Sequence, residues 1–228
     1  MIVLKSARLR RVLGILLPAV LLPAAAVLAA LLLPARRWFI GVFAMVLLSL
    51  LFFLTGFERR RCGARRMVLV AVMAALCVVS RFLPIVKPVA ALIILAGLWL
   101  GGEAGFLTGA LAAVLSNLFF GQGPWTAFQM LAWGLIGLFA GLLAPCLRAH
   151  RAALLCYGAA AGILFSLVMD VWTALWANGS PDFSVYLASV VSAAPFTLLY
   201  ALSNTLFLAL FARPFGRRME RMVRKYDL

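Results

Sequence analysis

The sequence of 228 residues is 66% hydrophobic and only 12% charged, with a mean hydropathy of +1.12. Soluble domains contain roughly 45–50% apolar and about 25% charged residues, so this composition excludes a soluble globular protein, a disordered chain and a disulfide scaffold. The formal net charge is +15, from 21 Lys and Arg against six Asp and Glu. Because cytoplasmic loops of membrane proteins collect Lys and Arg, this surplus indicates a membrane protein and not a nucleic-acid partner.

Apolar runs follow one another along the chain and predict an all-α, polytopic membrane protein, since a crossing helix needs about 20 apolar residues. The runs cover residues 12–34, 38–56, 67–83, 88–101, 104–120, 126–146, 152–176 and 188–212. The run 88–101 is short for a full crossing, so we expect it to be extended by its flanks, re-entrant, or placed where the bilayer thins. The first run is interpreted as a retained helix that can kink at Pro18 and Pro23, not as a signal peptide.

The distribution of Lys and Arg favours eight crossings with both termini in the cytoplasm. Under this arrangement only four of the 21 positive residues face outward, namely Arg36, Arg37, Arg81 and Lys87. The basic segment 57–66 divides the chain into two predicted parts. Residues 1–66 form two extra transmembrane helices and a basic cytoplasmic loop. Residues 67–228 form a six-helix core with a basic cytoplasmic tail, in which small and polar residues are more frequent.

Residues that support catalysis or metal binding are scarce. The four cysteines, at positions 62, 77, 146 and 156, lack metal-ligand spacing, and the only histidine is His150 in a basic loop. The sequence contains no hydrolase or nucleotide-binding motif, and no pair of carboxylates is placed for acid–base chemistry. It therefore predicts a protein that is not an enzyme, with no catalytic site, no metal site and no cofactor.

Polar side chains inside apolar helices are costly and usually face the interior of a helix bundle. Asn117 lies near the outer end of one run, and Gln129 and Trp133 share one face of the next. Asp170 lies about 9 Å from the outer end of a third run, at 1.5 Å per residue. We expect these residues to meet in the outer half of the membrane. Asn204 lies about 24 Å deep by the same measure, which predicts a helix-packing hydrogen bond instead.

Asp170 is the only acidic residue inside a predicted span, and several roles fit it. It contacts the ligand, or it makes a structural hydrogen bond or an ion pair with Arg81 or Lys87. A further alternative is a proton or cation site in a stand-alone secondary transporter. The outer segment Arg81–Pro88 is either a lid that reaches an anionic group or an ordinary snorkelling segment at the interface.

The uncharged stretch Asn117–Thr126 contains the sequence Gly-Gln-Gly-Pro-Trp, which excludes a smooth helix. A tight turn with an interfacial Trp and a binding loop both explain it, and we favour the binding loop, with Gln122 and Trp125 as contacts. Small residues at four-residue spacing predict close helix packing. The pairs are Ala71/Ala75, Gly97/Gly101, Gly105/Gly109, Gly137/Gly141 and Gly158/Gly162.

The stretch Arg66–Arg213 resembles the substrate-binding S component of energy-coupling factor (ECF) transporters, the vitamin-uptake branch of the ABC class. The matching elements are Lys87-Pro88 leading into Ile93–Gly97, Gly105–Ala110, Ser116–Trp133, and Ala194–Phe196 through Asn204 to Arg213-Pro214. The resemblance implies six helices that enclose one vitamin near the outer face, capped by outer loops. The Gly-Gln-Gly-Pro-Trp pattern is most similar to S components assigned to cobalamin. Other vitamins and a queuosine-type precursor are the alternatives.

The resemblance also implies a role and partners. The chain is expected to be the binding subunit of an ECF-type ABC importer in a prokaryotic cell membrane, with a transmembrane scaffold subunit and two ATPase subunits. Ala71 and Ala75 match the motif with which the family docks on the scaffold. The two N-terminal helices depart from the usual six. The candidate substrate-binding residues are Lys87, Asn117, Gln122, Trp125, Gln129, Trp133 and Asp170.

Overall fold

A computed structural model describes residues 14, 16–32, 38–57, 63–178 and 182–226, and every regular element within these ranges is helical. The elements are η1 (Leu17–Leu21), α2 (Leu22–Leu32), α3 (Trp38–Phe57), α4 (Gly63–Ser80), α5 (Val89–Leu100), α6 (Gly102–Phe120), α7 (Trp125–Leu142), α8 (Ala144–Ala149), α9 (Arg151–Asn178) and α10 (Phe183–Tyr226). The all-α prediction is confirmed. The predicted charges at 5–11, 36–37 and 59–61, Cys62 and the tail end at 227–228 lie outside the described residues.

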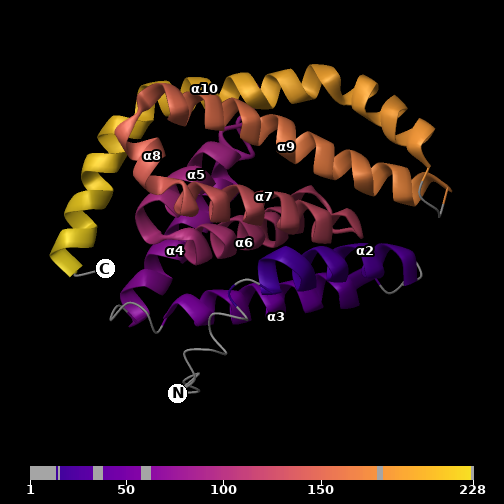
Figure 1. Cartoon of the computed structure of the whole chain (residues 1–228), viewed down its shortest axis with the longest axis horizontal. Coiled ribbons are helices and arrows are strands. Elements are labelled where there is room, and N and C mark those ends of the chain that lie inside the picture. Colours follow the sequence, from indigo (N-terminus) through magenta and orange to yellow (C-terminus); the bar gives the residue numbers. More distant parts are fainter. Residues whose placement is uncertain (1–13, 15, 33–37, 58–62, 179–181, 227–228) are drawn as a thin grey trace.

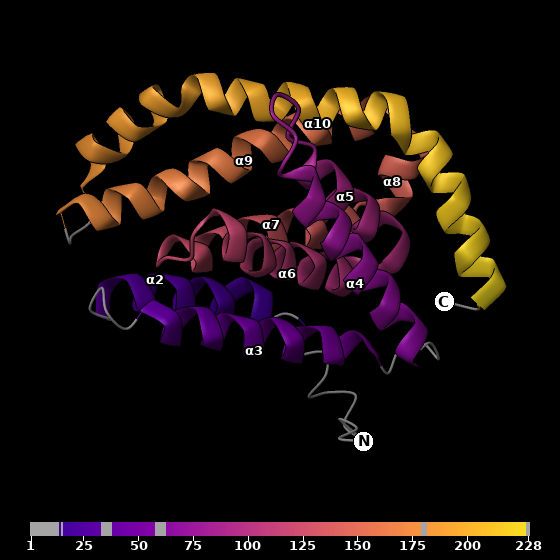
Figure 2. The same cartoon turned by 180° about the vertical axis from the view of Figure 1, so that it is seen from behind.

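The helices pack in layers around the short α5. Helices α2 and α3 lie along one side of α6 and α7, and the long pair α9–α10 lies along the other side, as Figures 1 and 2 show. Helix α5 contacts α4, α6, α7 and α10. Almost all of its side chains are buried, which explains why its sequence is apolar on every face.

Within the described residues, four helical stretches are long and apolar enough to cross a membrane. They are Gly102–Phe120, Trp125–Leu142, Arg151–Ala177 and Phe183–Met222. The apolar parts of α3 and α5 are shorter, at Phe39–Phe53 and Val89–Leu100. The short run 88–101 is therefore a buried central helix of 12 residues, wrapped by its neighbours.

The structure differs in detail from two of the predicted runs. The run 126–146 is two helices, because α7 ends at Leu142 and α8 starts beside Pro145, whose ring cannot continue an α-helical hydrogen-bond pattern. The last helix, α10, continues beyond the apolar run 188–212 into the basic tail as far as Tyr226. Arg and Lys are good helix formers, so a basic sequence does not end a helix. Pro195 and Pro214 inside α10 account for its curved path in Figure 1.

The predicted kink in the first run takes the form of a π-helical turn. This turn, η1, has Pro18 among its first residues. Proline lacks the N–H that an α-helix uses, and π-helical turns commonly absorb such interruptions. The chain returns to α-helix at Leu22 and keeps it through Pro23.

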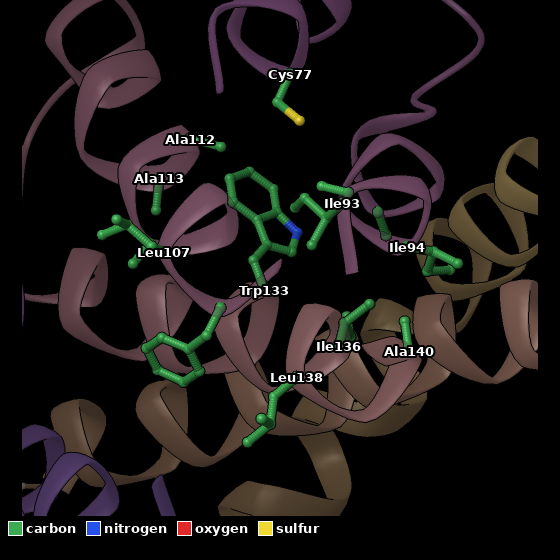
Figure 3. Packing of buried hydrophobic residues seen from close by; sticks show 14 of the residues in the cluster. Cys77, Ile93, Ile94, Leu107, Ala112, Ala113, Trp133, Ile136, Leu138 and Ala140 are labelled. Carbon is green, nitrogen blue, oxygen red and sulfur yellow. The ribbon is translucent and has the colours of Figure 1, made fainter. Parts of the chain in front are cut away.

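Glycines bring α5, α6 and α7 into backbone contact. A Cβ atom on Gly105 would lie 2.5 Å from the carbonyl oxygen of Gly137 and 2.7 Å from the Cα atom of Gly97. Neither distance leaves room for a side chain, so the predicted close packing of small residues is confirmed at this seam. Figure 3 shows part of the buried core, with Trp133 among groups such as Cys77 and Ile93.

Arg66, predicted to be part of a basic loop, lies inside α4 and is only 2% exposed. Its Nε and Nη2 donate to the carbonyl oxygen of Leu100 at 3.0 and 2.6 Å. The guanidinium also lies 3.8 Å from the Glu103 carboxylate and over the ring of Phe53. Burial of this charge is tolerated because the guanidinium has a carbonyl, a carboxylate and an aromatic ring as partners. The contacts connect α3, α4 and the α5–α6 turn.

Candidate functional site

Two adjoining hollows form a cavity between the α4–α5 connection and helices α5, α6, α7, α9 and α10, at the end of the bundle predicted to face outward. The first has a volume of about 160 Å³ and is lined by Arg81, Lys87, Val89, Ala90, Phe120, Gln129, Trp133, Gly162, Phe165, Tyr200 and Asn204. The second, of about 320 Å³, shares five of these residues and adds Asn117, Gly121, Trp125, Ser166, Met169, Asp170, Ala193 and Phe196. Together they are called the outer cavity.

Arg81 stands at the centre of the outer cavity and lines both hollows. It follows the end of α4, and its Nη1 donates to Ser116 Oγ at 2.5 Å and to Asn117 Oδ1 at 2.7 Å. The guanidinium carbon lies 4.6 Å from the ring centroid of Phe120 and 5.4 Å from that of Trp133. Arginine keeps its proton at neutral pH, so this side chain is a fixed positive charge.

Asn117 connects Arg81 to helix α7 through hydrogen bonds. Its side-chain nitrogen donates to Thr126 Oγ1 at 3.0 Å and to Gln129 Oε1 at 2.8 Å. Asn117 is 2% exposed, so a hydrogen-bonded arrangement of this kind is strongly favoured over alternatives. The amide nitrogen of Gln129 makes no hydrogen bond within the described residues. Since Gln129 lines both hollows, this donor is available to a ligand.

The Gly-Gln-Gly-Pro-Trp sequence builds the turn between α6 and α7. Gly121 has a φ of 98°, which favours glycine. Gln122 donates to the carbonyl oxygen of Val114 at 2.7 Å and accepts from Thr126 at 3.1 Å, and it lines neither hollow. The ring of Trp125 covers Gly123 so closely that a Cβ there would collide with it. Trp125, 38% exposed, lines the second hollow. Of the predicted loop contacts, the structure therefore brings only Trp125 to the cavity.

Aromatic rings form one wall of the outer cavity. Trp133 and Phe165 are stacked, with centroids 5.3 Å apart and planes 17° apart. Tyr200 meets Phe165 edge-on, at 5.5 Å and 88°. Trp133 is only 5% exposed, and Figure 3 shows most of its indole among core side chains. Its role at the cavity is thus partly to hold Phe165 in place.

Asp170 and Lys87 do not pair. Asp170 lines the second hollow and is 6% exposed, and its Oδ2 is buried without a hydrogen-bond partner in the described part of the chain. Lys87 lines the first hollow, and its Nζ donates to the carbonyl oxygen of Arg81 at 3.0 Å. The ion pair predicted as one alternative, between Asp170 and Arg81 or Lys87, is therefore wrong. A buried carboxylate without a partner is costly, which favours a ligand donor at this position.

Asn204 combines two roles. Its Oδ1 accepts a hydrogen bond from the backbone N–H of Ala91 at 3.2 Å, so the predicted helix-packing bond is confirmed. Asn204 also lines the first hollow, so the prediction that it lies too deep to join the site is wrong. Depth was counted from helix ends, and the α9–α10 tip projects beyond the α6–α7 end in both views (Figures 1 and 2).

A protein-family model decides the identity of this bundle. The model of the ECF-type riboflavin transporter S component matches residues 62–219. The chain belongs to this family. No curated protein and no solved structure gives a match.

As an ECF S component, the chain is a substrate-binding subunit of an ECF importer for a vitamin, and a multi-pass protein of the cell membrane. The family is a transporter family and not an enzyme family. Membership implies transmembrane and ATPase modules as partners. The resemblance seen in the sequence is confirmed at this level, but the match gives no support to the cobalamin-type subgroup. It begins one residue before α4, so α2 and α3 lie outside the matched region.

Sequence reasoning missed several residues that line the cavity of this S component. Arg81 was predicted as part of an outer segment and as a possible partner of Asp170, but not as a substrate-binding residue, and its position as one of two outward charges in the core was the available signal. Phe120, Phe165 and Tyr200 gave no signal, because single aromatic residues are common in apolar helices.

Proposed function

We propose that the chain captures riboflavin from the outer face of the membrane and holds it in the outer cavity. The observation that carries this proposal is the aromatic wall of Trp133, Phe165 and Tyr200, next to polar groups on Gln129 and Asp170 that have no hydrogen-bond partner in the described part of the chain. Riboflavin combines a flat tricyclic ring with a uracil-like edge and a polyol chain. Aromatic side chains suit the ring, and a few polar groups that fix its orientation suit the edge and the hydroxyls.

The polar groups of the outer cavity can each be paired with a hydrogen-bonding group of a flavin. The carboxylate of Asp170 accepts from a ring N–H or a hydroxyl, and the amide of Gln129 donates to a carbonyl. Lys87 and Asn204 line the first hollow and supply further polar contacts there. The riboflavin description of the matched family supports this choice of vitamin.

The size of the cavity argues against cobalamin, the vitamin favoured from the sequence. Its hollows measure about 160 and 320 Å³, near the lower end of ligand pockets, which span roughly 300–1,000 Å³. A corrinoid with its nucleotide loop is far larger than a flavin. To admit it, α9 and α10 would have to move well away from α7.

Binding by the purified chain tests the proposal. In isothermal titration calorimetry we expect riboflavin to bind with one molecule per chain and cyanocobalamin to give no heat. Lumichrome, which has the ring but not the polyol, serves as the matched ligand and should bind more weakly. If cyanocobalamin binds and riboflavin does not, the assignment of the vitamin is wrong.

We further propose that one face of α4 docks on the scaffold subunit. Ala71 and Ala75 are exposed, and Val68, Val72 and Val79 beside them are 60%, 49% and 65% exposed. These positions are three or four residues apart and form one apolar stripe. Its small residues allow a second helix to approach closely.

Bulky substitutions separate docking from binding. Ala71→Trp with Ala75→Trp should abolish uptake in cells that carry the complete transporter, while riboflavin still binds to the purified variant. Ala160→Trp, at an exposed position of α9, is the control and should leave uptake unchanged. Uptake that survives both α4 substitutions would exclude this face as the docking surface. Uptake that ignores ATP depletion but stops with an uncoupler would favour the stand-alone transporter that uses Asp170.

A further inference from the structure

A second cavity lies at the opposite end of α5 from the outer cavity. Val89 and Ala90, at the start of α5, line the outer cavity, whereas Leu98 and Trp99, near its end, line the second. The positions are about 13 Å apart along the helix axis, at 1.5 Å per residue. The second cavity has a volume of about 410 Å³ and lies between α5, α8, α9 and α10. It is called the basic cavity.

Arginines dominate the rim of the basic cavity. Arg148, Arg151, Arg213 and Arg217 line it, against a single acid, Glu220. Arg148 lies 3.5 Å from Glu220, and Arg151 donates to the carbonyl oxygen of Ala209 at 3.0 Å. Arg213 and Arg217 form no hydrogen bond or ion pair within the described ranges. They are four residues apart on α10, so both point from the same face of the helix.

The floor of the basic cavity is apolar. It is formed by leucines from four helices, Leu98, Leu147, Leu154 and Leu208. A rim of positive charge above an apolar floor suits a molecule that carries a phosphate at one end and hydrocarbon at the other. A free inorganic anion would use the rim but gain nothing from the leucines.

Trp99 adds a second, independent sign of a missing partner. Its indole Nε1 is buried and has no hydrogen-bond acceptor among the described residues. The ring is held against α10, because a Cβ on Gly216 would lie 2.7 Å from it, and the guanidinium of Arg148 lies 5.4 Å from its centroid. Buried indole N–H groups usually find an acceptor. A phosphate or ester oxygen in the basic cavity would supply one.

We propose that the basic cavity binds the headgroup of an anionic phospholipid. Arg213 and Arg217 hold the phosphate diester, and the leucine floor receives the first carbons of an acyl chain. Basic pockets between transmembrane helices bind anionic headgroups in this way on the cytoplasmic side. The charge distribution predicts the same side for this end of the bundle. The bound lipid would fasten the basic part of α10 to the leaflet, independently of which vitamin the chain carries.

The test is native mass spectrometry of the purified full-length chain with phosphatidylglycerol or phosphatidylcholine of identical acyl chains. We expect phosphatidylglycerol to be retained about tenfold better, since each arginine near a headgroup favours the anionic lipid. Arg213→Gln with Arg217→Gln should remove this preference. Arg218→Gln with Arg221→Gln is the control, because it removes the same charge from the same helix at exposed positions outside the cavity. Thermal unfolding of both variants in detergent reports whether they are folded.

Other results would overturn the proposal. Equal loss in both double variants would indicate diffuse attraction to a basic surface. Displacement of the lipid by glycerol phosphate at comparable concentration would indicate a free-anion site. Unchanged lipid retention in Arg213→Gln with Arg217→Gln would show that these arginines do not bind the lipid and would favour a protein partner for them. If that variant does not fold, Trp99→Phe keeps the ring and removes only the N–H, and it should lower phosphatidylglycerol retention severalfold but leave phosphatidylcholine unchanged.

Discussion

The outer cavity and the basic cavity lie at opposite ends of α5. They differ in whether all of their arginines have hydrogen-bond partners in the described part of the chain. In the outer cavity the guanidinium of Arg81 is held by hydrogen bonds to Ser116 and Asn117, and an amide donor and one carboxylate remain for a ligand. In the basic cavity Arg213 and Arg217 keep their positive charge without a partner in the described part of the chain. The first arrangement suits a neutral aromatic molecule, and the second suits an anion. One short apolar helix thus separates two different recognition chemistries.

The two cavities lie about 13 Å apart along α5, whose packing on α6 and α7 is fixed by the glycine seam. Backbones that touch at Gly97, Gly105 and Gly137 leave no space for water or a side chain. The two ends can therefore be tested separately, because substitutions this far apart and without shared partners usually act independently.

Among the substitutions that distinguish the two cavities, Arg81→Met is expected to have the largest effect, a loss of riboflavin affinity. The substitution removes both hydrogen bonds at the centre of the outer cavity and leaves buried Asn117 without its donor. Riboflavin affinity should fall roughly 100-fold, because hydrogen bonds to charged groups contribute about 1.5–3 kcal/mol. Titration calorimetry measures the loss, and Arg218→Gln is the control. Retention of phosphatidylglycerol should not change, and a parallel loss would show that the two cavities are not independent.

Gly137→Ala tests the seam itself. The added Cβ would collide with the backbone of Gly105, so we expect the free energy of unfolding to fall by about 1–3 kcal/mol. Thermal unfolding in detergent measures this change. The matched variant Gly158→Ala places its Cβ against the flexible end of Leu208 and should have little effect. Equal stability of both variants would mean that the seam tolerates a wider separation.

Asp170→Asn is expected to have the smallest effect. The amide keeps the shape of the side chain but loses the charge that accepts a donor from the ligand, so riboflavin affinity should fall about tenfold. Uptake should remain dependent on ATP. Full affinity in this variant would assign Asp170 a structural role.

The fold was predictable where hydropathy alone decides it. The apolar runs gave the helical class, and most helices lie within a few residues of them. The length of α10 was not predictable, because a basic sequence reads equally as a solvated tail and as the end of a helix. Arg66 was misplaced for the same reason, since the sequence does not show that Leu100, Glu103 and Phe53 surround it.

The site was predictable only through residues that are unusual in a membrane. Asn117, Gln129 and Asp170 stand out as polar groups in apolar helices, and the structure places all three at the outer cavity. Phe165 and Tyr200 do not stand out in such helices. Gln122 stood out but is used inside the turn, because a local carbonyl and Thr126 satisfy its amide. Helix rotation decides which polar residues bind each other and which remain free for a ligand. Hydropathy does not encode this rotation.

The buried guanidinium of Arg66 has a practical consequence for shortening the protein. A chain cut back to residue 67, at the boundary suggested by composition, would lose the group that caps the Leu100 carbonyl. A chain that starts at Gly63 would keep Arg66, but its guanidinium would lose the contact with the ring of Phe53. Either truncation removes support from the turn between α5 and α6. The N-terminal helices are therefore better treated as part of one folding unit than as a detachable leader.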